Sequence, residues 1–359
     1  YNTVLWDPIS KEVASVSNES LSSKENWCAA HSQLGDGRLF AVTGNVGTAD
    51  PHGDILDYTT NQWMSIADMA FGRYYPSTTF MADGRVVVAG GDYINPDTGN
   101  VDNPFPEIWT NGAWRTFEEP LTTSPTEIEF DFYYGSFFPW TQQGPNGKIF
   151  YAGPQSDLRY IDPGHVDATG GGSVTSVAQR DGQSRDYGGY ATYDICKVLI
   201  AGGGDSLSCA YAIDYNLQDS ANSTGLDAPS VSQTGTMLIV RLNFYTTILA
   251  DGTVLATGGN RDGGIILASQ AGAVFMAELW NPKTGDWTVM DSMSRRREYH
   301  SVAILLPDAR VVHAGGDCTP CDPQTNLEVF SPPYLYNEDG SEADRPQITD
   351  APDDVGYGE

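Results

Sequence analysis

A short pattern that recurs along the 359 residues constrains the fold more than any other feature of this sequence. Each copy has a tight turn of the Asp-Gly-Arg kind, then four or five apolar residues of high β propensity, then glycine. The clearest copies run from Asp83 to Gly91 and from Asp251 to Gly259. Each copy predicts a hairpin whose second strand ends where glycine permits a sharp exit of the backbone. The six copies cover residues 36–44, 83–91, 146–153, 194–203, 251–259 and 308–316.

A second signature lies between the copies. It has an apolar strand, a polar turn and a tryptophan, as in Leu56 to Trp63 and Leu279 to Trp287. Two hairpins in each period of roughly fifty residues form the four-stranded blade of a Kelch-type β-propeller. We therefore expect an all-β, seven-bladed propeller, with the seventh blade closed by residues 4–8 and 327–332. A β-sandwich is the alternative fold, but it would not repeat Gly-Gly at this period.

The character of the chain changes after Tyr336. Residues 337–343 are polar and acidic, and an extended segment starts at Arg345. We expect residues 1–336 to form the propeller. Residues 337–359 are expected to form a linker and the first strand of a truncated C-terminal domain.

The charge of the chain excludes two classes of partner. It has 47 acidic and 19 basic residues, for a formal net charge of -28. Such a surface repels nucleic acid and anionic membranes. No apolar run approaches the length of a membrane span. We therefore expect neither a nucleic-acid partner nor a membrane span.

Five cysteines point to an oxidising compartment. Cys318 and Cys321 form a CxxC pair, and Cys196 and Cys209 lie thirteen residues apart. Both pairs are plausible local disulfides, which suits a secreted, extracellular protein. Cys28 is left over, and an odd cysteine in a secreted protein requires an explanation.

One position in the repeat carries unusual side chains. Nine residues before the turn, the first copy has Cys28, the second Tyr75, and the last His300 preceded by Tyr299. These residues should lie on strands that line the central channel, where side chains from several blades can converge. Tyr and Cys at inner strands also serve simply as packing, which is the alternative interpretation. Neighbours on a strand face opposite ways, so Tyr299 and His300 must lie in the loop before it to share the channel.

Tyrosine and histidine together suggest a copper site. A phenol has a pKa near 10 and ligates near pH 7 only if a strong Lewis acid ionises it. Cu(II) is the strongest common divalent candidate. Zinc is less favoured, because the pair Cys318 and Cys321 lacks a second pair of ligands. An unpaired cysteine beside a tyrosine can couple oxidatively to the ring. Copper and a thioether-stabilised tyrosyl radical would together supply two one-electron centres.

Several segments resemble the galactose oxidase and glyoxal oxidase family of copper-radical oxidases. The resemblance covers essentially the whole chain, in order and in blade register. The segments that carry it are residues 26–28, 72–77, 297–301, 305–308, 318–321 and 334–337.

The resemblance implies roles for particular residues. Cys28 and Tyr75 would form the thioether-linked radical cofactor. Tyr299 would be the axial copper ligand and the base that takes the substrate proton, and His300 an equatorial ligand. Tyr93 stands where galactose oxidase has the tryptophan that stacks on the thioether.

The same resemblance gives expectations for the rest of the chain. Cys318 and Cys321 would form the family's local disulfide. The family takes a further histidine ligand from a C-terminal immunoglobulin-like domain, which the propeller would contact. The other histidines here, such as His31, His52 and His313, are expected to be structural or surface residues.

These observations favour an oxidase that converts a primary alcohol or aldehyde and reduces O₂ to hydrogen peroxide. Its partners would be a small-molecule or carbohydrate substrate and O₂. The alternative is a non-catalytic extracellular propeller that acts as a binding or structural module for an extracellular partner. A third interpretation is a glycan-binding lectin. It is supported only by tryptophans such as Trp63 and Trp287, which more often pack within blades.

Overall fold

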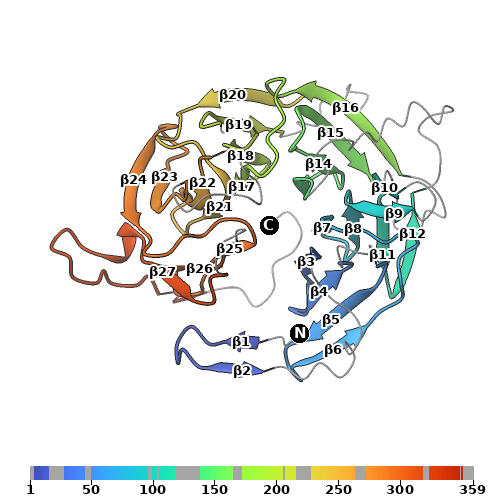
Figure 1. The fold of residues 1–359 in the computed structure, drawn as a ribbon, viewed down its shortest axis with the longest axis horizontal. Helices are drawn as coiled ribbons and strands as arrows, with labels where there is room; N and C mark the ends of the chain where they lie inside the picture. The colour runs from blue at the N-terminus through green and yellow to red at the C-terminus, as the bar shows by residue number, and fades with distance from the viewer. Residues whose placement is uncertain are drawn as a thin grey trace.

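Small antiparallel sheets arranged around a central axis make up the fold (Figure 1). The structure is a computed structural model. It describes residues 4–15, 28–44, 50–95, 99–102, 105–117, 138–164, 172–204, 207–215, 228–262, 272–317, 323–347 and 349–350. The first strands of neighbouring sheets contact each other, as β3 contacts β7 and β21 contacts β25. These first strands therefore surround the axis.

The first three sheets have four strands each, numbered from the axis outward. The first contains β3 (Ala30–Gln33), β4 (Leu39–Val42), β5 (Gly53–Asp57) and β6 (Gln62–Ser65). The second contains β7 (Ser77–Phe80), β8 (Val86–Ala89), β11 (Glu107–Thr110) and β12 (Ala113–Thr116). The third contains β13 (Thr141–Gln143), β14 (Ile149–Tyr151), β15 (Asp157–Asp162) and β16 (Ser173–Gln179).

The next three sheets complete the described ring. The fourth contains β17 (Gly189–Asp194), β18 (Lys197–Ala201), β19 (Ala210–Asp214) and β20 (Ser230–Thr234). The fifth contains β21 (Leu242–Ile248), β22 (Val254–Asn260), β23 (Met276–Trp280) and β24 (Trp287–Ser292). The sixth has three strands, β25 (Ser301–Leu305), β26 (Val311–Gly315) and β27 (Leu327–Phe330). We call these sheets blades 1 to 6.

Short elements accompany the blades. β1 (Val4–Trp6) pairs with β2 (Val13–Ser15), and β9 (Asp92–Asn95) pairs with β10 (Gly99–Asp102). The 3₁₀-helix η1 spans Pro333–Leu335. No helix among the described residues is long and apolar enough to cross a membrane.

The core lies between successive blades rather than in one central mass. Blades 4 and 5, for example, bury Leu199, Phe244 and Trp280 in a shared cluster. The second strand of most blades is buried along its length, as in β8 and β22. A strand covered on both faces needs a continuous apolar run, so the repeat shows such a run in place of alternation.

Glycine at the end of the second strand is required by close packing. Gly258 has φ of 73°, and a Cβ there would lie 2.2 Å from the carbonyl oxygen of Arg297. Gly202 repeats this arrangement in blade 4, where a Cβ would lie 2.8 Å from the carbonyl oxygen of Arg241. The Gly-Gly of the repeat therefore lets each second strand pass close to an inner loop.

A buried arginine holds four of these inner loops in place. Its Nη1 donates to the first glycine carbonyl of the exit, at 2.8–3.0 Å in each blade. A carboxylate accepts from the same guanidinium. The four pairs are Arg73 with Glu107, Arg185 with Asp181, Arg241 with Glu278, and Arg297 with Glu328.

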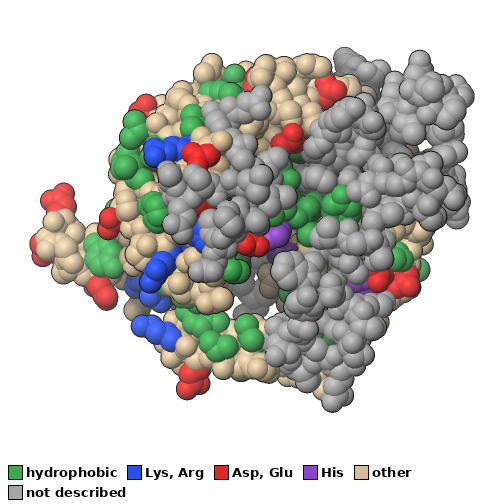
Figure 2. Space-filling view, viewed as in Figure 1, with side chains coloured by type: hydrophobic (Ala, Val, Ile, Leu, Met, Phe, Trp, Pro, Cys, Tyr) green, Lys and Arg blue, Asp and Glu red, His purple; other side chains and the backbone are tan. Residues whose placement is uncertain are grey.

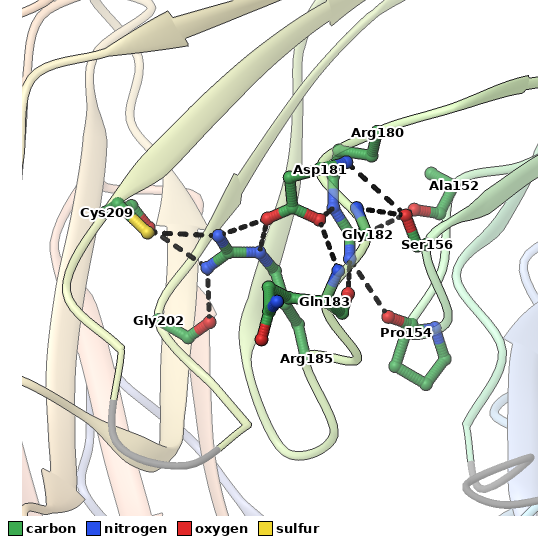
Figure 3. A network of polar contacts seen from close by, with 10 residues as sticks. All are labelled: Ala152, Pro154, Ser156, Arg180, Asp181, Gly182, Gln183, Arg185, Gly202 and Cys209. Atoms are coloured by element: carbon green, nitrogen blue, oxygen red, sulfur yellow. Dashed lines mark hydrogen bonds and ion pairs between the residues drawn. The ribbon is translucent and has the colours of Figure 1, made fainter.

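In blade 4 this arginine belongs to a larger network (Figure 3). Asp181 accepts from Arg180 Nε at 3.1 Å and from Arg185 Nη2 at 2.5 Å. Arg185 also donates to Cys209, at 3.2 Å to the carbonyl oxygen and 3.0 Å to Sγ. Arg180 reaches the carbonyl oxygen of Ala152 at 3.1 Å, so the network ties blade 4 to blade 3.

The sheets agree only in part with the expectation that residues 4–8 and 327–332 close a seventh blade. Leu327–Phe330 forms β27 and pairs with β26, so this segment completes blade 6 instead of a seventh blade. β1 and β2 form a separate two-stranded sheet. In Figure 1 this hairpin lies at the side of the ring between blade 6 and blade 1. The described residues form a six-bladed propeller.

The predicted disulfide between Cys196 and Cys209 is wrong, because both cysteines are free. Tyr215 donates its N–H to the carbonyl of Cys196, whereas Gly202 donates to that of Cys209. These contacts lie at opposite ends of the β18–β19 pair, which spans five residues of register. At about 3.3 Å per residue the separation far exceeds the reach of a disulfide. The other predicted pair, Cys318 and Cys321, lies outside the described residues.

The segment after the propeller contacts blade 6. Tyr334 donates its hydroxyl to the carbonyl of Ala309 at 2.7 Å, and Arg345 Nη1 donates to that of Asp308 at 2.7 Å. Both contacts are to the turn between β25 and β26. The boundary at residue 336 and the further domain stay predictions.

Candidate copper site at the propeller axis

Six residues share an unusual backbone conformation at the entrance to the inner strands. Each has φ between 52° and 61°, in the left-handed region where non-glycine residues are uncommon. Each lies nine residues before the turn of its copy, so the same register applies in every blade. The six are Cys28 (58°), Tyr75 (61°), Phe138 (52°), Tyr187 (58°), Asn243 (54°) and His300 (59°).

Main-chain hydrogen bonds connect these entrance residues. Tyr75 donates its N–H to the carbonyl of Cys28 at 2.8 Å, and Phe138 donates to Tyr75 at 2.7 Å. Asn243 donates to Tyr187 at 2.9 Å. Neighbouring blades therefore fix each other's entrance loops around the axis.

Blade 6 has one extra residue in this loop. In blade 5 the turn residue Gly252 comes eleven positions after Arg241. In blade 6 the corresponding Ala309 comes twelve positions after Arg297. The extra residue lets Tyr299 and His300 both reach the axis from the turn before β25. This loop position removes the conflict expected for two neighbours on a strand.

Three donor atoms converge at this point. The hydroxyl of Tyr75 contacts that of Tyr299 and lies 3.4 Å from His300 Nε2. The rings of Tyr299 and His300 stack, with centroids 3.9 Å apart. Cys28 packs against Tyr75, and its thiol makes a hydrogen bond with that side chain. The structure thus brings four of the predicted site residues together.

Burial keeps these groups in their neutral forms. It raises the pKa of Tyr75, and contacts with Cys28 and Tyr299 raise it further. Burial also raises the pKa values of Tyr299 and Cys28 and lowers that of His300. Two phenols, a thiol and an imidazole share little space, and no Lys or Arg among the described residues lines the cavity beside them. A bound cation would reverse this preference for the neutral phenols.

The donor set fits a copper ion. Two phenol oxygens and one imidazole nitrogen face a common point, and phenolate with imidazole is a set that suits Cu(II). No cluster of three His, Cys, Asp or Glu side chains that could hold a metal occurs in the part of the chain that the structure describes. A metal held at the axis by the described residues would therefore need the tyrosines as ligands.

Asp317 gives the histidine a second contact. Its Oδ2 lies 3.8 Å from His300 Nδ1, and its N–H donates to the carbonyl of Tyr299 at 2.6 Å. A carboxylate on the far nitrogen of a metal-binding histidine fixes the ring orientation and leaves the other nitrogen free to ligate. Here that other nitrogen is Nε2, which faces Tyr75.

Arg73 and Arg297 do not act on the tyrosines that follow them. Their guanidinium groups instead face Glu107 and Glu328 and the glycine carbonyls. Their role is to hold the loop backbone.

A cavity of about 850 Å³ opens beside the donors and continues along the inner strands. Its wall includes Cys28, Tyr75, Tyr299 and His300 at one end and Ile304 of β25 farther along. In the space-filling view, hydrophobic and histidine side chains lie near the middle of the face, beside a hollow (Figure 2). The donors are thus accessible to a small molecule.

Sequence reasoning missed several residues of this cavity wall, among them the entrance residues Phe138, Tyr187 and Asn243. Tyr187 packs edge-on to Tyr299 at 6.2 Å, and Phe138 lies 5.0 Å from the ring of Tyr75. The signal was present in the sequence. The count of nine that found Cys28 leads to these residues when it is applied to the other three copies.

The remaining predicted residues are placed as follows. Tyr93 lies on β9 opposite Val101, and its side chain is outside what the structure describes. His31 lines the cavity from β3, whereas His52 and His313 are buried. Trp63 is buried in blade 1, which favours packing over glycan binding.

Comparisons with known proteins point in one direction. No family model matches the chain. Galactose oxidase of Gibberella zeae is 29% identical over 371 residues, covering 97% of this chain and 51% of that protein. Aldehyde oxidase GLOX of Vitis pseudoreticulata is 23% identical, covering 93% of this chain and 65% of that protein. The chain spans about half the length of the galactose oxidase it matches.

A solved structure shares the fold. It is a fungal alcohol oxidase of the AA5 family in complex with copper, with a TM-score of 0.78 and 22% identity. The alignment covers 97% of this chain and 71% of that one. The solved structure thus shares the propeller fold with this chain, and the relatives named here are oxidases. The resemblance of this chain to the galactose oxidase and glyoxal oxidase family is confirmed.

Proposed function

We propose that this chain carries the propeller part of a copper-dependent oxidase that acts on primary alcohols or aldehydes. The overall reaction on an alcohol is RCH₂OH + O₂ → RCHO + H₂O₂, which balances in atoms and electrons. The observation that carries the proposal is the convergence of Tyr75, Tyr299 and His300 beside an accessible cavity. The oxidase names of the relatives support it.

Each residue at the axis has a proposed part. Tyr75, Tyr299 and His300 would hold copper, which supplies one-electron redox chemistry when bound. Asp317 would orient His300. Tyr299 would accept the proton of the substrate hydroxyl, because its oxygen is next to the cavity. Cys28 would bond through Sγ to a ring carbon of Tyr75, and the thiol hydrogen and the ring hydrogen, with their two electrons, would pass to O₂ to give H₂O₂.

Other parts of the proposal extend beyond the axis. A further ligand would come from a C-terminal immunoglobulin-like domain, and a seventh blade would include β1 and β2. The Cys318–Cys321 disulfide, the stacking role of Tyr93 and secretion of the protein are proposed on the family resemblance.

Peptide mapping by mass spectrometry tests the covalent step. After exposure to Cu(II) and O₂, the reduced and denatured protein should yield a Cys28–Tyr75 peptide about two mass units below the sum of its parts. Cys28→Ser, treated in the same way, should yield none. Cys209 is a matched internal control, because it is a half-buried free thiol whose Sγ faces Arg185 instead of a tyrosine.

The opposite result would decide against the oxidase. If Cys28 remains alkylatable to the same extent as Cys209 after copper and oxygen, the radical chemistry is absent. The fold would then act as a binding or structural module.

A further inference from the structure

The cavity wall has two chemically different halves. The candidate metal donors and Cys28 come from blades 1, 2 and 6. The opposite half comes from blades 3, 4 and 5 and consists mainly of aromatic rings. These rings belong to Phe138, Trp140, Tyr187, Tyr190, Phe244 and Tyr245.

The aromatic half is held rigid by its own contacts. Trp140 and Tyr190 stack with their planes 2° apart and centroids at 5.9 Å. Phe138 stands at the entrance to blade 3, where its side chain is 41% exposed although its backbone is fixed by Tyr75. An exposed ring on a fixed loop can contact a ligand at little cost in conformational entropy.

Three polar side chains of this wall, those of Thr246, Asp186 and Glu298, are already hydrogen-bonded or buried. Thr246 donates its hydroxyl to the carbonyl of Tyr190 at 2.6 Å, and Asp186 Oδ2 accepts from Ser184 at 2.8 Å. Asp186 Oδ1 and both carboxyl oxygens of Glu298 are buried. A hexose carries several hydroxyls into its site, and any hydroxyl that faced these three side chains or the aromatic rings would lose water without gaining a partner.

The charges on the wall disfavour anions. The ionisable acids that line it are Asp186 and Glu298, and no Lys or Arg lines it among the residues that the structure describes. A carboxylate on the substrate would therefore lack a cation partner in a partly dehydrated site.

From these observations we propose the substrate class of this cavity. It takes a neutral, flat aromatic body, such as a benzyl alcohol or a benzaldehyde, in preference to a hexose or a carboxylate-bearing molecule. The ring packs against Phe138 and Tyr187, with its CH₂OH or CHO group toward Tyr299. The reaction itself depends on the proposed function, whereas the binding preference does not.

Binding to the full chain can be measured without turnover. Isothermal titration calorimetry should show benzyl alcohol binding at least tenfold more tightly than galactose, which is also neutral. Equal affinities, or tighter binding of galactose, would overturn the proposal.

A pair of variants locates the site. Phe138→Leu keeps an apolar side chain but removes the ring, and should weaken benzyl alcohol binding roughly two- to twelvefold, the range of an aromatic pair. Phe275→Leu is the matched control, because Phe275 is 39% exposed and lies outside the cavity. It should bind benzyl alcohol as the parent does. Equal affinities for both variants and the parent would remove Phe138 from the site.

A second ligand tests the electrostatic part of the proposal. 4-Carboxybenzyl alcohol has the same ring and reacting group as benzyl alcohol but adds a carboxylate. It should bind at least tenfold more weakly, and similar affinities would contradict the electrostatic argument. If benzyl alcohol binds in the predicted order but is never oxidised, the proposed function fails while the binding inference stands.

Discussion

One histidine at the interface between blades 5 and 6, His313, is buried without a hydrogen-bond partner for its ring. His313 on β26 is 3% exposed, and neither of its ring nitrogens has a hydrogen-bond partner. It packs against Gly258 and the ring of Tyr245. Burial, reinforced by the positive charge of Arg297, lowers its pKa to about 3.

This residue makes stability depend on pH. Its folded-state pKa of about 3 lies below the ordinary 6.5, so the unfolded state binds the proton more readily. Stability is therefore lost as pH falls from 6.5 toward 3. Between pH 7.5 and 5 the loss is about 2 kcal/mol from this group alone. In urea denaturation, the free energy of unfolding of His313→Gln should fall by about 2 kcal/mol less than that of the parent between pH 7.5 and pH 5. An unchanged slope would mean that the imidazole is not neutral in the fold.

At the scale of the element, the blade is a hairpin repeat with two kinds of glycine. Gly84, in a turn, has φ of 86° and open space around the position of a Cβ. Gly258, at a strand exit, has a similar φ of 73° but no space. The same residue type therefore serves backbone conformation in one place and close packing in the other.

Alanine substitution should separate these two roles. Gly84→Ala incurs only the left-handed conformation and should cost about 1–2 kcal/mol. Gly258→Ala adds a clash with the Arg297 carbonyl and should cost more than about 3 kcal/mol. Denaturant midpoints of the two variants would measure the difference. Equal losses would show that the inner loop of blade 6 yields without strain.

The sequence predicted much of the repeated hairpin of the blades, but not all residues of the candidate site. The Gly-Gly repeat indicated the propeller because both its turn and its exit require left-handed backbone. The count of nine located Cys28, Tyr75 and His300, since every entrance residue keeps one register. The pairing of Leu327–Phe330 and the distance between Cys196 and Cys209 were not predictable, because strand register is set by neighbours distant in sequence.

At the scale of the whole molecule, charge dominates. A formal net charge of -28 spread over one surface destabilises the compact state by self-repulsion. The buried arginine pairs hardly sense added salt, because screening acts mainly on exposed charges.

Salt should therefore stabilise the protein. At pH 7 the midpoint of thermal unfolding should rise between about 20 mM and about 300 mM NaCl, as the Debye length falls below the spacing of surface charges. Near pH 4.2, the sequence pI, the rise should vanish. A midpoint that falls with salt at pH 7 would mean that surface ion pairs outweigh the repulsion.

The contact between Tyr75 and Tyr299 joins residues that are 224 positions apart in the chain. Closing so long a loop is an entropic cost that only a nearly complete ring of blades can offset. The donors therefore cannot meet in a partly folded chain. The copper chemistry proposed above would thereby be restricted to molecules that have finished folding.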